Sequence, residues 1–178
     1  VYNDKYDGYF CNRRKGDGGG CALWLRKETC TKRKLLFIDN GDDYIPLEAL
    51  CVKFKYDKQY FVVLVIYSPS RKSKKSRGQK NIQLLRKMVE EGRKSKIPEK
   101  NYIVIGTFNR SKVNPGKKDQ LRLTLYEYTG GMSELDQIYG TNKSLPYSVD
   151  TRNPIHYNQH HLDKTKSKYP IIELKDCT

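Results

Sequence analysis

Long apolar runs are missing from this sequence. No stretch approaches the length of about 18 consecutive apolar residues that a membrane-spanning helix needs, so such a helix is not expected. No fixed period is visible, which excludes collagen, coiled coils and repeat arrays. No two cysteines form a Cys-x-x-Cys pair, so a zinc site is not expected either. The chain is therefore expected to fold around a hydrophobic core of its own.

The cysteines are few, odd in number and far apart. Two of them, Cys21 and Cys51, stand inside apolar runs and are typical of small buried side chains. We expect reduced thiols in an intracellular protein. The sequence begins at Val1 without a signal-type apolar region, which favours a fragment or a processed product. The five cysteines are Cys11, Cys21, Cys30, Cys51 and Cys177.

Acidic residues are scarce relative to basic ones. The 178 residues include 35 Lys and Arg against 20 Asp and Glu, which gives a formal net charge of +15. This excess favours a polyanionic partner, either nucleic acid or an anionic membrane surface. The clustering of the charge favours nucleic acid, and with it the nucleus as one expected location. The alternative is a basic surface that serves only solubility.

Length and apolar patterning predict one mixed α/β domain over residues 1–178. Two apolar runs, 47–56 and 60–67, predict an antiparallel hairpin because only residues 57–59 separate them. Strands dominate, so two packed sheets fit better than a doubly wound sheet. Trp24 and the strand tyrosines are expected in the core. Further strands are expected at 21–26, 35–38, 102–106, 121–125, 135–139 and 171–174.

Residues 71–80 carry six bases and no acid, a composition that predicts a solvated loop. The following segment, 81–92, predicts a helix. Its apolar residues Ile82, Leu85 and Val89 share one face, and Gly92 is a typical C-terminal stop.

Six short blocks follow one another along the chain. They are 14–27 with its three glycines, 47–54, 65–69, the Ile-Gly-Thr-Phe-Asn of 105–109, 135–138 and 166–171. In this order they resemble the endonucleases of non-LTR retrotransposons, which belong to the DNase-I-like exonuclease–endonuclease–phosphatase superfamily. The resemblance implies a two-sheet β-sandwich flanked by helices. The family's first strands have no counterpart here, so the sandwich is expected to lack them.

The family's chemistry is metal-assisted phosphodiester hydrolysis, in which a Mg²⁺ ion held by Asn and Glu side chains neutralises developing charge. The resemblance matches Tyr67 to the active-site tyrosine, Asn109 to an asparagine, Thr129 to a threonine and Asp136 to an aspartate. The strands that carry the metal ligands have no counterpart in this sequence. The resemblance therefore implies a site with no metal cofactor, unless upstream residues complete it.

Three ionisable catalytic positions are replaced. The water-activating aspartate falls on Thr107, and the family's final Asp–His pair falls on Ser167 and Lys168. Threonine and serine are not ionised at neutral pH, and lysine meets a phosphate only as a point charge. Losing one acid–base group costs roughly 10²–10⁴ in rate. The resemblance therefore implies nucleic-acid binding without cutting.

Nearby histidines offer a substitute base or metal site. His160, His161 and Asp163 stand just before the replaced pair, but adjacent histidines on a loop seldom point to one ion. A polar loop with solvated histidines is the favoured interpretation.

Three cationic sets follow the strand ends that the family fold places near the former active-site face, and we expect them to bind phosphates. They are Lys72, Lys74, Lys75 and Arg77; Arg110, Lys112, Lys117 and Lys118; and Lys164, Lys166 and Lys168.

Two other functions stay open. One is a structural or interaction scaffold whose charge meets an acidic protein. The other is a live Mg²⁺-dependent endonuclease or phosphodiesterase completed by upstream residues. A second copy or a partner chain is also expected to cover the sheet edge that the missing strands leave exposed.

Overall fold

The computed structural model describes residues 4–13, 20–41, 47–68, 74–108, 124–125, 136–140, 148–150 and 171–173. They belong to two compact units, Val1–Lys143 and Ser144–Thr178. This division does not test the expected single domain, which stays a prediction. Within the described ranges, no helix is both long and apolar enough to cross a membrane.

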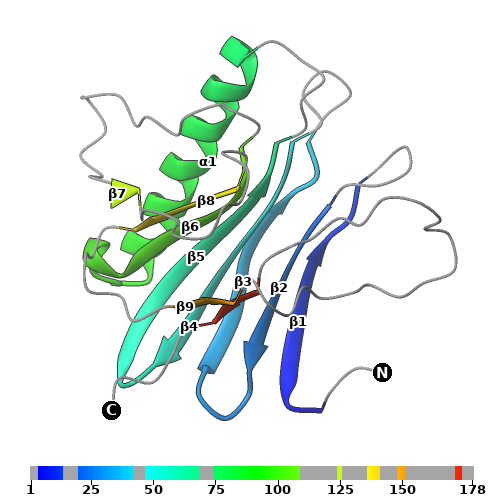
Figure 1. Ribbon diagram of the computed structural model, residues 1–178. Helices are drawn as coiled ribbons and strands as arrows, with labels where there is room; N and C mark the ends of the chain where they lie inside the picture. Colours follow the sequence, from blue (N-terminus) through cyan, green and yellow to red (C-terminus); the bar gives the residue numbers. More distant parts are fainter. Residues whose placement is uncertain are drawn as a thin grey trace, which may run out of the picture. The chain divides into compact units, whose positions relative to one another are not determined.

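The first unit is built on a mixed six-stranded sheet with the order β3-β4-β5-β6-β8-β7 (Figure 1). Neighbouring strands are antiparallel except β5 and β6, which are parallel. A parallel pair needs a crossover, which helix α1 (Lys74–Lys94) and the 3₁₀ helix η1 (Glu99–Asn101) supply. The strands are β3 (Thr31–Asp39), β4 (Glu48–Tyr56), β5 (Gln59–Tyr67), β6 (Tyr102–Thr107), β7 (Thr124–Leu125) and β8 (Asp136–Gly140).

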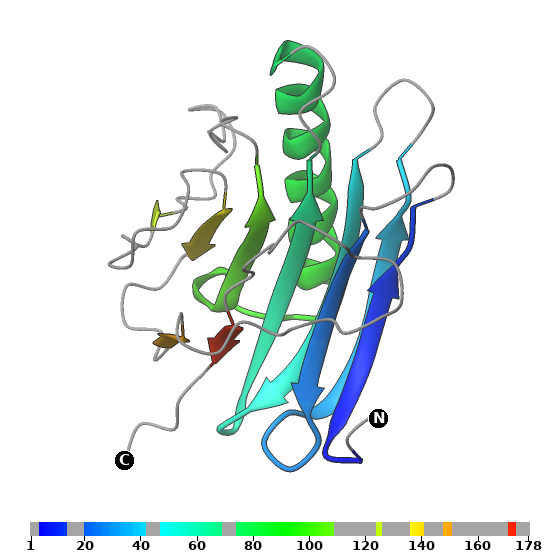
Figure 2. The ribbon, with the colours of Figure 1, turned by 45° about the vertical axis from the view of Figure 1, so that its right-hand side comes forward.

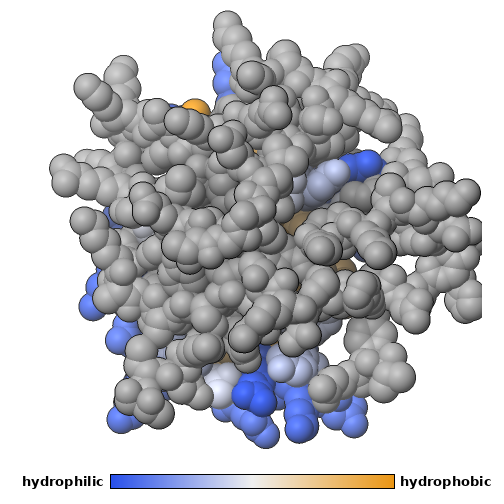
Figure 3. Space-filling view, viewed as in Figure 1, coloured by the Kyte–Doolittle hydropathy of each residue, from blue (hydrophilic) through white to orange (hydrophobic). Residues whose placement is uncertain are grey.

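Strands β4 and β5 form the predicted antiparallel hairpin. Their turn residues, Asp57 and Lys58, both have positive φ angles, 41° and 62°, as a type I′ turn requires. The turn lies at the end of the sheet where β2 also passes into β3, and Figure 3 shows hydrophilic residues at that end. The paired ends of β4 and β5 that carry Glu48 and Tyr67 lie at the opposite end.

Both faces of the sheet centre are covered. Helix α1 buries Leu84 and Met88 against Cys51 and Leu64 on one face. A second, two-stranded antiparallel sheet, β1 (Tyr6–Cys11) and β2 (Cys21–Arg26), packs against β4 and β5 on the other face (Figure 2). The expected fold class, two packed sheets with a flanking helix, is confirmed.

Strand β1 was not predicted, since residues 1–20 are mostly polar. Its burial explains why: only the inward Cys11 is fully covered, while the opposite face remains accessible. Trp24 of β2 is not in the core as predicted, because it lies on this outer face with 38 % of its surface exposed. There its ring meets Phe10 edge to face at 5.4 Å.

Helix α1 begins earlier than predicted. It starts at Lys74, so much of the basic run 71–80 is helical and not a loop. Lys, Arg and Gln are good helix formers, and an exposed helix face solvates them as well as a loop does. The helix also continues past Gly92 to Lys94, so Gly92 is not its stop.

The helix ends in a Schellman motif without glycine. The amide of Ile97 donates to the carbonyl of Gly92 at 3.0 Å, and the amide of Lys96 donates to that of Arg93 at 2.9 Å. Lys96 takes the left-handed position that glycine usually fills, with φ of 55°. Gly92 is required for another reason, since a Cβ there would lie 2.0 Å from Oη of Tyr102.

In the second unit the structure describes one antiparallel strand pair, β9 (Ser148–Asp150) and β10 (Ile171–Glu173). Strand β10 falls in the predicted segment 171–174, whereas β9 was not predicted. Too few apolar residues stand around 148–150 to mark a strand.

Candidate functional site

Four residues from four strands lie side by side at one end of the six-stranded sheet. Register pairs Glu48 of β4 with Tyr67 of β5, Tyr67 with Thr107 of β6, and Thr107 with Asp136 of β8. We call these four residues the strand-end row. Three of them, Tyr67, Thr107 and Asp136, are positions that the resemblance assigned to a former active site, and the fold brings them together as neighbours.

Close backbone contact holds β5 and β6 together at this row. A Cβ at Gly106 would lie 1.9 Å from the carbonyl oxygen of Ile66, so the residue before Thr107 must be glycine. Past the strand end, the amide of Ser68 donates to the carbonyl of Thr107 at 2.9 Å. The glycine of the Gly-Thr-Phe-Asn block therefore seats Thr107 beside Tyr67.

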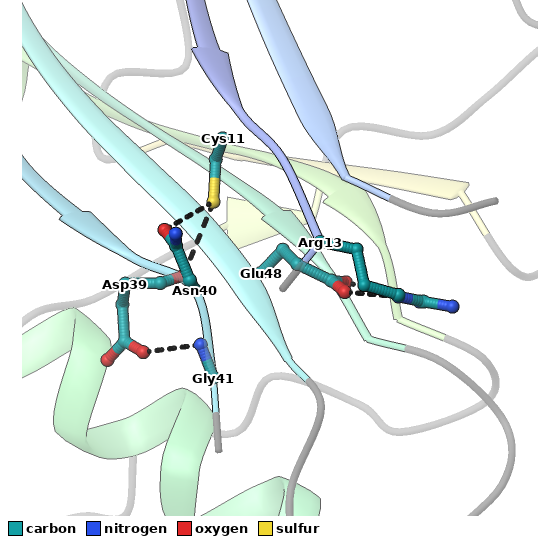
Figure 4. A network of polar contacts seen from close by, with 6 residues as sticks. All are labelled: Cys11, Arg13, Asp39, Asn40, Gly41 and Glu48. Carbon is teal, nitrogen blue, oxygen red and sulfur yellow. Dashed lines mark hydrogen bonds and ion pairs between the residues drawn. The ribbon is translucent and has the colours of Figure 1, made fainter. Parts of the chain in front are cut away.

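Glu48 of the row forms an ion pair, with Arg13, that the sequence did not reveal. Arg13, just past the end of β1, donates from Nε to Oε1 of Glu48 at 2.6 Å, and its Nη2 lies 3.5 Å from Oε2 (Figure 4). The Glu48 side chain is fully buried, whereas 19 % of the Arg13 side chain is exposed. Cζ of Arg13 lies 5.6 Å from the centre of the Tyr67 ring.

The electrostatics of Arg13 follow from these neighbours. The hydrogen bond to Glu48 raises the pKa of the guanidinium, partial burial opposes that change, and the charge of Glu48 and contact with Tyr67 add to it. Arg13 is therefore a permanent cation fixed at the row.

A second set of contacts fixes the end of β1 that leads to Arg13. The thiol of Cys11 lies 3.4 Å from the carbonyl oxygen of Asp39 and 3.3 Å from Oδ1 of Asn40 (Figure 4). The amide of Gly41 donates to Oδ1 of Asp39 at 2.9 Å. The pKa of Cys11 is lowered, mainly by a hydrogen bond with Cys21, its paired residue on β2. These contacts attach β1 to the end of β3.

One of the predicted cationic sets begins at the same end of the sheet as the strand-end row. Because α1 crosses over from the carboxyl end of β5, its first turns start at the end where Tyr67 lies. The backbone of Lys74, Lys75 and Arg77 belongs to these turns, and the helix N-terminus adds positive partial charge. Farther along the helix, Lys80 pairs with Asp39 at 3.0 Å.

Several predicted site residues lie outside the described residues. These are the former catalytic positions Asn109, Thr129, Ser167 and Lys168, and the cations Lys72, Arg110, Lys112, Lys117, Lys118, Lys164 and Lys166, with His160, His161 and Asp163.

Of the two residues in the ion pair, Glu48 could have been noticed in the sequence, since it is an acid inside the apolar run 47–54. Arg13 carried no such signal.

No family model and no curated protein matches this sequence. Solved structures do share its fold at 18–19 % identity, and each covers 82 % of this chain. They include the human Nocturnin catalytic domain with bound sulfate (TM-score 0.57), a mannosyl-6-phosphatase of Bacteroides thetaiotaomicron (0.57), and an endonuclease/exonuclease/phosphatase family protein from that bacterium (0.56).

This chain spans 63 %, 65 % and 62 % of the lengths of those three proteins. The likeness shows the fold: the chain has the DNase-I-like fold of endonuclease/exonuclease/phosphatase proteins. The predicted DNase-I-like fold is thereby confirmed, while membership of the superfamily and closeness to retrotransposon endonucleases stay predictions.

Glu48 of the strand-end row does not suit the Mg²⁺ ion that the resemblance implies. Magnesium requires oxygen ligands, mainly carboxylates. Both carboxylate oxygens of Glu48 already face Arg13, so a metal ion there would have to displace a buried ion pair. Among the residues that the structure describes, no three His, Cys, Asp or Glu residues gather where an ion would fit.

Proposed function

We propose that this chain binds nucleic acid through its phosphates, at the sheet end that carries the strand-end row, and does not hydrolyse it. The observation that carries this proposal is the place of Thr107, between Tyr67 and Asp136 in the row. The resemblance puts a water-activating aspartate at this position, and a threonine hydroxyl accepts no proton at neutral pH. The second unfavourable feature for hydrolysis is Glu48, whose charge is neutralised by Arg13.

Charge supports the binding half of the proposal. The net charge of +15 attracts a polyanion, and Lys74, Lys75 and Arg77 belong to the start of α1, which follows the strand end that carries Tyr67. Each lysine or arginine that contacts a phosphate releases counterions, so affinity falls steeply with salt. Binding of this kind reads the backbone and not the base sequence.

The binding test is a salt series. Fluorescence anisotropy with a labelled single-stranded oligonucleotide and its duplex measures affinity from about 50 to about 200 mM salt. We expect log K to fall linearly with log salt, and the K74A/K75A variant to have a shallower slope, by about one unit per lost phosphate contact. No affinity for either probe at low salt would overturn the proposal and favour the scaffold alternative.

The cleavage test uses supercoiled plasmid with Mg²⁺. We expect no nicking by the wild-type chain. A matched preparation of the Tyr67→Phe variant identifies contaminating nuclease, which would nick equally in both samples. Nicking by wild type that the Tyr67→Phe substitution removes would show a live phosphodiesterase and overturn the non-hydrolytic half of the proposal.

A further inference from the structure

A fully buried acid holds Arg13 in place. Glu48 is the first residue of β4, its side chain has no exposed surface, and its carboxylate accepts Nε of Arg13 at 2.6 Å. Burying a carboxylate is costly unless it is paired and hydrogen-bonded. The ion pair with Arg13 offsets the cost of burying the Glu48 carboxylate. It also fixes the position and the orientation of the guanidinium.

The pair leaves part of the guanidinium free of Glu48. Arginine has five N–H donors in a planar fork, and Glu48 faces only its Nε and Nη2 side. Figure 4 shows the far end of the Arg13 side chain pointing away from the carboxylate. Part of this side chain is exposed. Its guanidinium also hydrogen-bonds Tyr67 of the strand-end row, and its Cζ lies 5.6 Å from the centre of that ring.

We propose that Arg13 is a phosphate-binding residue, which donates hydrogen bonds from the outer part of its guanidinium to oxygens of one nucleic-acid phosphate, and that Glu48 is its positioning residue. This inference rests on the proposed function and adds a defined contact to it. A guanidinium fork matches two phosphate oxygens, and a lysine ammonium does not. Because Glu48 cancels the charge of Arg13, the contact depends on orientation more than on net charge.

The chain offers a matched control pair. Arg33 donates from Nε to Oδ2 of Asp7 at 2.6 Å, and 21 % of its side chain is exposed, close to the value for Arg13. Asp7 lies near the start of β1, whereas Arg13 follows its end. The double variants R13M/E48M and R33M/D7M each remove one positive and one negative charge, so both keep the net charge of +15.

The experiment measures anisotropy of a labelled single-stranded oligonucleotide at one fixed salt concentration. We expect R13M/E48M to bind about tenfold more weakly than wild type, and R33M/D7M to bind as wild type does. Oligonucleotides with and without a 5′-phosphate identify the phosphate: a loss confined to the phosphorylated probe assigns a terminal phosphate, and an equal loss assigns a diester. Equal affinities for the two double variants would overturn the inference.

The measurements also distinguish failure of the proposed function from failure of the role proposed for Arg13. If wild type binds no oligonucleotide at low salt, the proposed function itself fails. If wild type binds and R13M/E48M binds equally well, only the role of Arg13 fails. Circular dichroism checks that each variant folds, and R13K serves where R13M/E48M does not fold. The R13K variant keeps the charge but not the fork, so we expect a severalfold loss of affinity, and wild-type binding by R13K would overturn the inference.

Discussion

Arg13 and Glu48 connect the two sheets of the first unit. Nε of Arg13, past the end of β1, lies 2.6 Å from Oε1 of Glu48, at the start of β4. The two residues are 35 positions apart in the sequence, so their contact exists only when β1–β2 packs on the larger sheet. The pair therefore couples the integrity of the fold to the geometry of the strand-end row.

Removing Arg13 alone should destabilise the fold. The R13M variant leaves the Glu48 carboxylate buried without its cation, and such a loss costs about 3 kcal/mol. The R13M/E48M variant removes both charges and should be more stable than R13M, because no unpaired charge remains. Urea denaturation monitored by circular dichroism gives the free energies of unfolding. A double variant no more stable than R13M would show that Glu48 does not depend on Arg13.

The contact between Gly92 and Tyr102 should exclude any side chain at position 92. Tyr102 is fully buried, and its hydroxyl donates to the carbonyl of Ile97 at 3.3 Å. A methyl group at Gly92 would meet this hydroxyl at 2.0 Å. Overpacking of this kind costs about 1–3 kcal/mol, against a gain of up to about 1 kcal/mol from better helix propensity.

A double-mutant cycle tests this contact. We expect G92A to destabilise the wild-type chain and to cost less in the Y102L background, where the clashing ring is gone. Additive effects of the two substitutions would show that Gly92 and Tyr102 do not interact.

Lys96→Gly should stabilise the protein. Lys96 holds the left-handed conformation at the end of α1 with φ of 55°, where a Cβ costs about 1 kcal/mol. Glycine adopts this conformation without strain, so we expect Tm to rise by roughly 2–4 °C in a thermal melt. The comparison substitution K94G, at the last residue of the helix, should lower Tm instead. Glycine is a poor helix former, and the ion pairs of Lys94 with Glu90 and Glu91 are lost. A fall in Tm for K96G would contradict the Schellman assignment.

The parts of the fold predicted from the sequence are those with strong local patterns. The runs 47–56 and 60–67 are long and apolar, which is why the β4–β5 hairpin was expected. Motif order assigns Tyr67, Thr107 and Asp136 to one former active site, and the register makes them neighbours, while their role in a site stays a prediction.

What escaped prediction depends on tertiary packing. Nothing in the composition near Arg13 indicates a partner at Glu48, because the pair forms across two sheets. The start of α1 escaped for another reason: a basic run without apolar residues looks the same as a loop or as a solvated helix face. Gly92 was read as a helix stop, since only the packed structure shows Tyr102 against it.

Stability should fall at alkaline pH because of Cys51. This thiol is fully buried between α1 and the sheet, and burial, followed by the charge of Glu91, raises its pKa, with Lys87 opposing. Below the unfolded-state pKa of 9.0 both states keep the proton, so the stabilisation is complete. Above it the unfolded chain loses the proton first, and this group's contribution declines by about 1.4 kcal/mol by pH 10.

The C51A variant isolates this effect. At pH 7 we expect C51A to be less stable than wild type by about 1 kcal/mol, because it leaves a small cavity. Between pH 8 and pH 10 wild type should lose stability faster, so the difference between the two chains shrinks or reverses. Tyr102, whose pKa burial also raises, is present in both chains; Cys51 is the last-ranked cause of that rise, so most of the contribution of Tyr102 cancels from the comparison. Urea titrations at each pH, with reductant present, measure the two curves. Parallel curves would mean that Cys51 titrates alike in the folded and unfolded chain, contrary to its buried position.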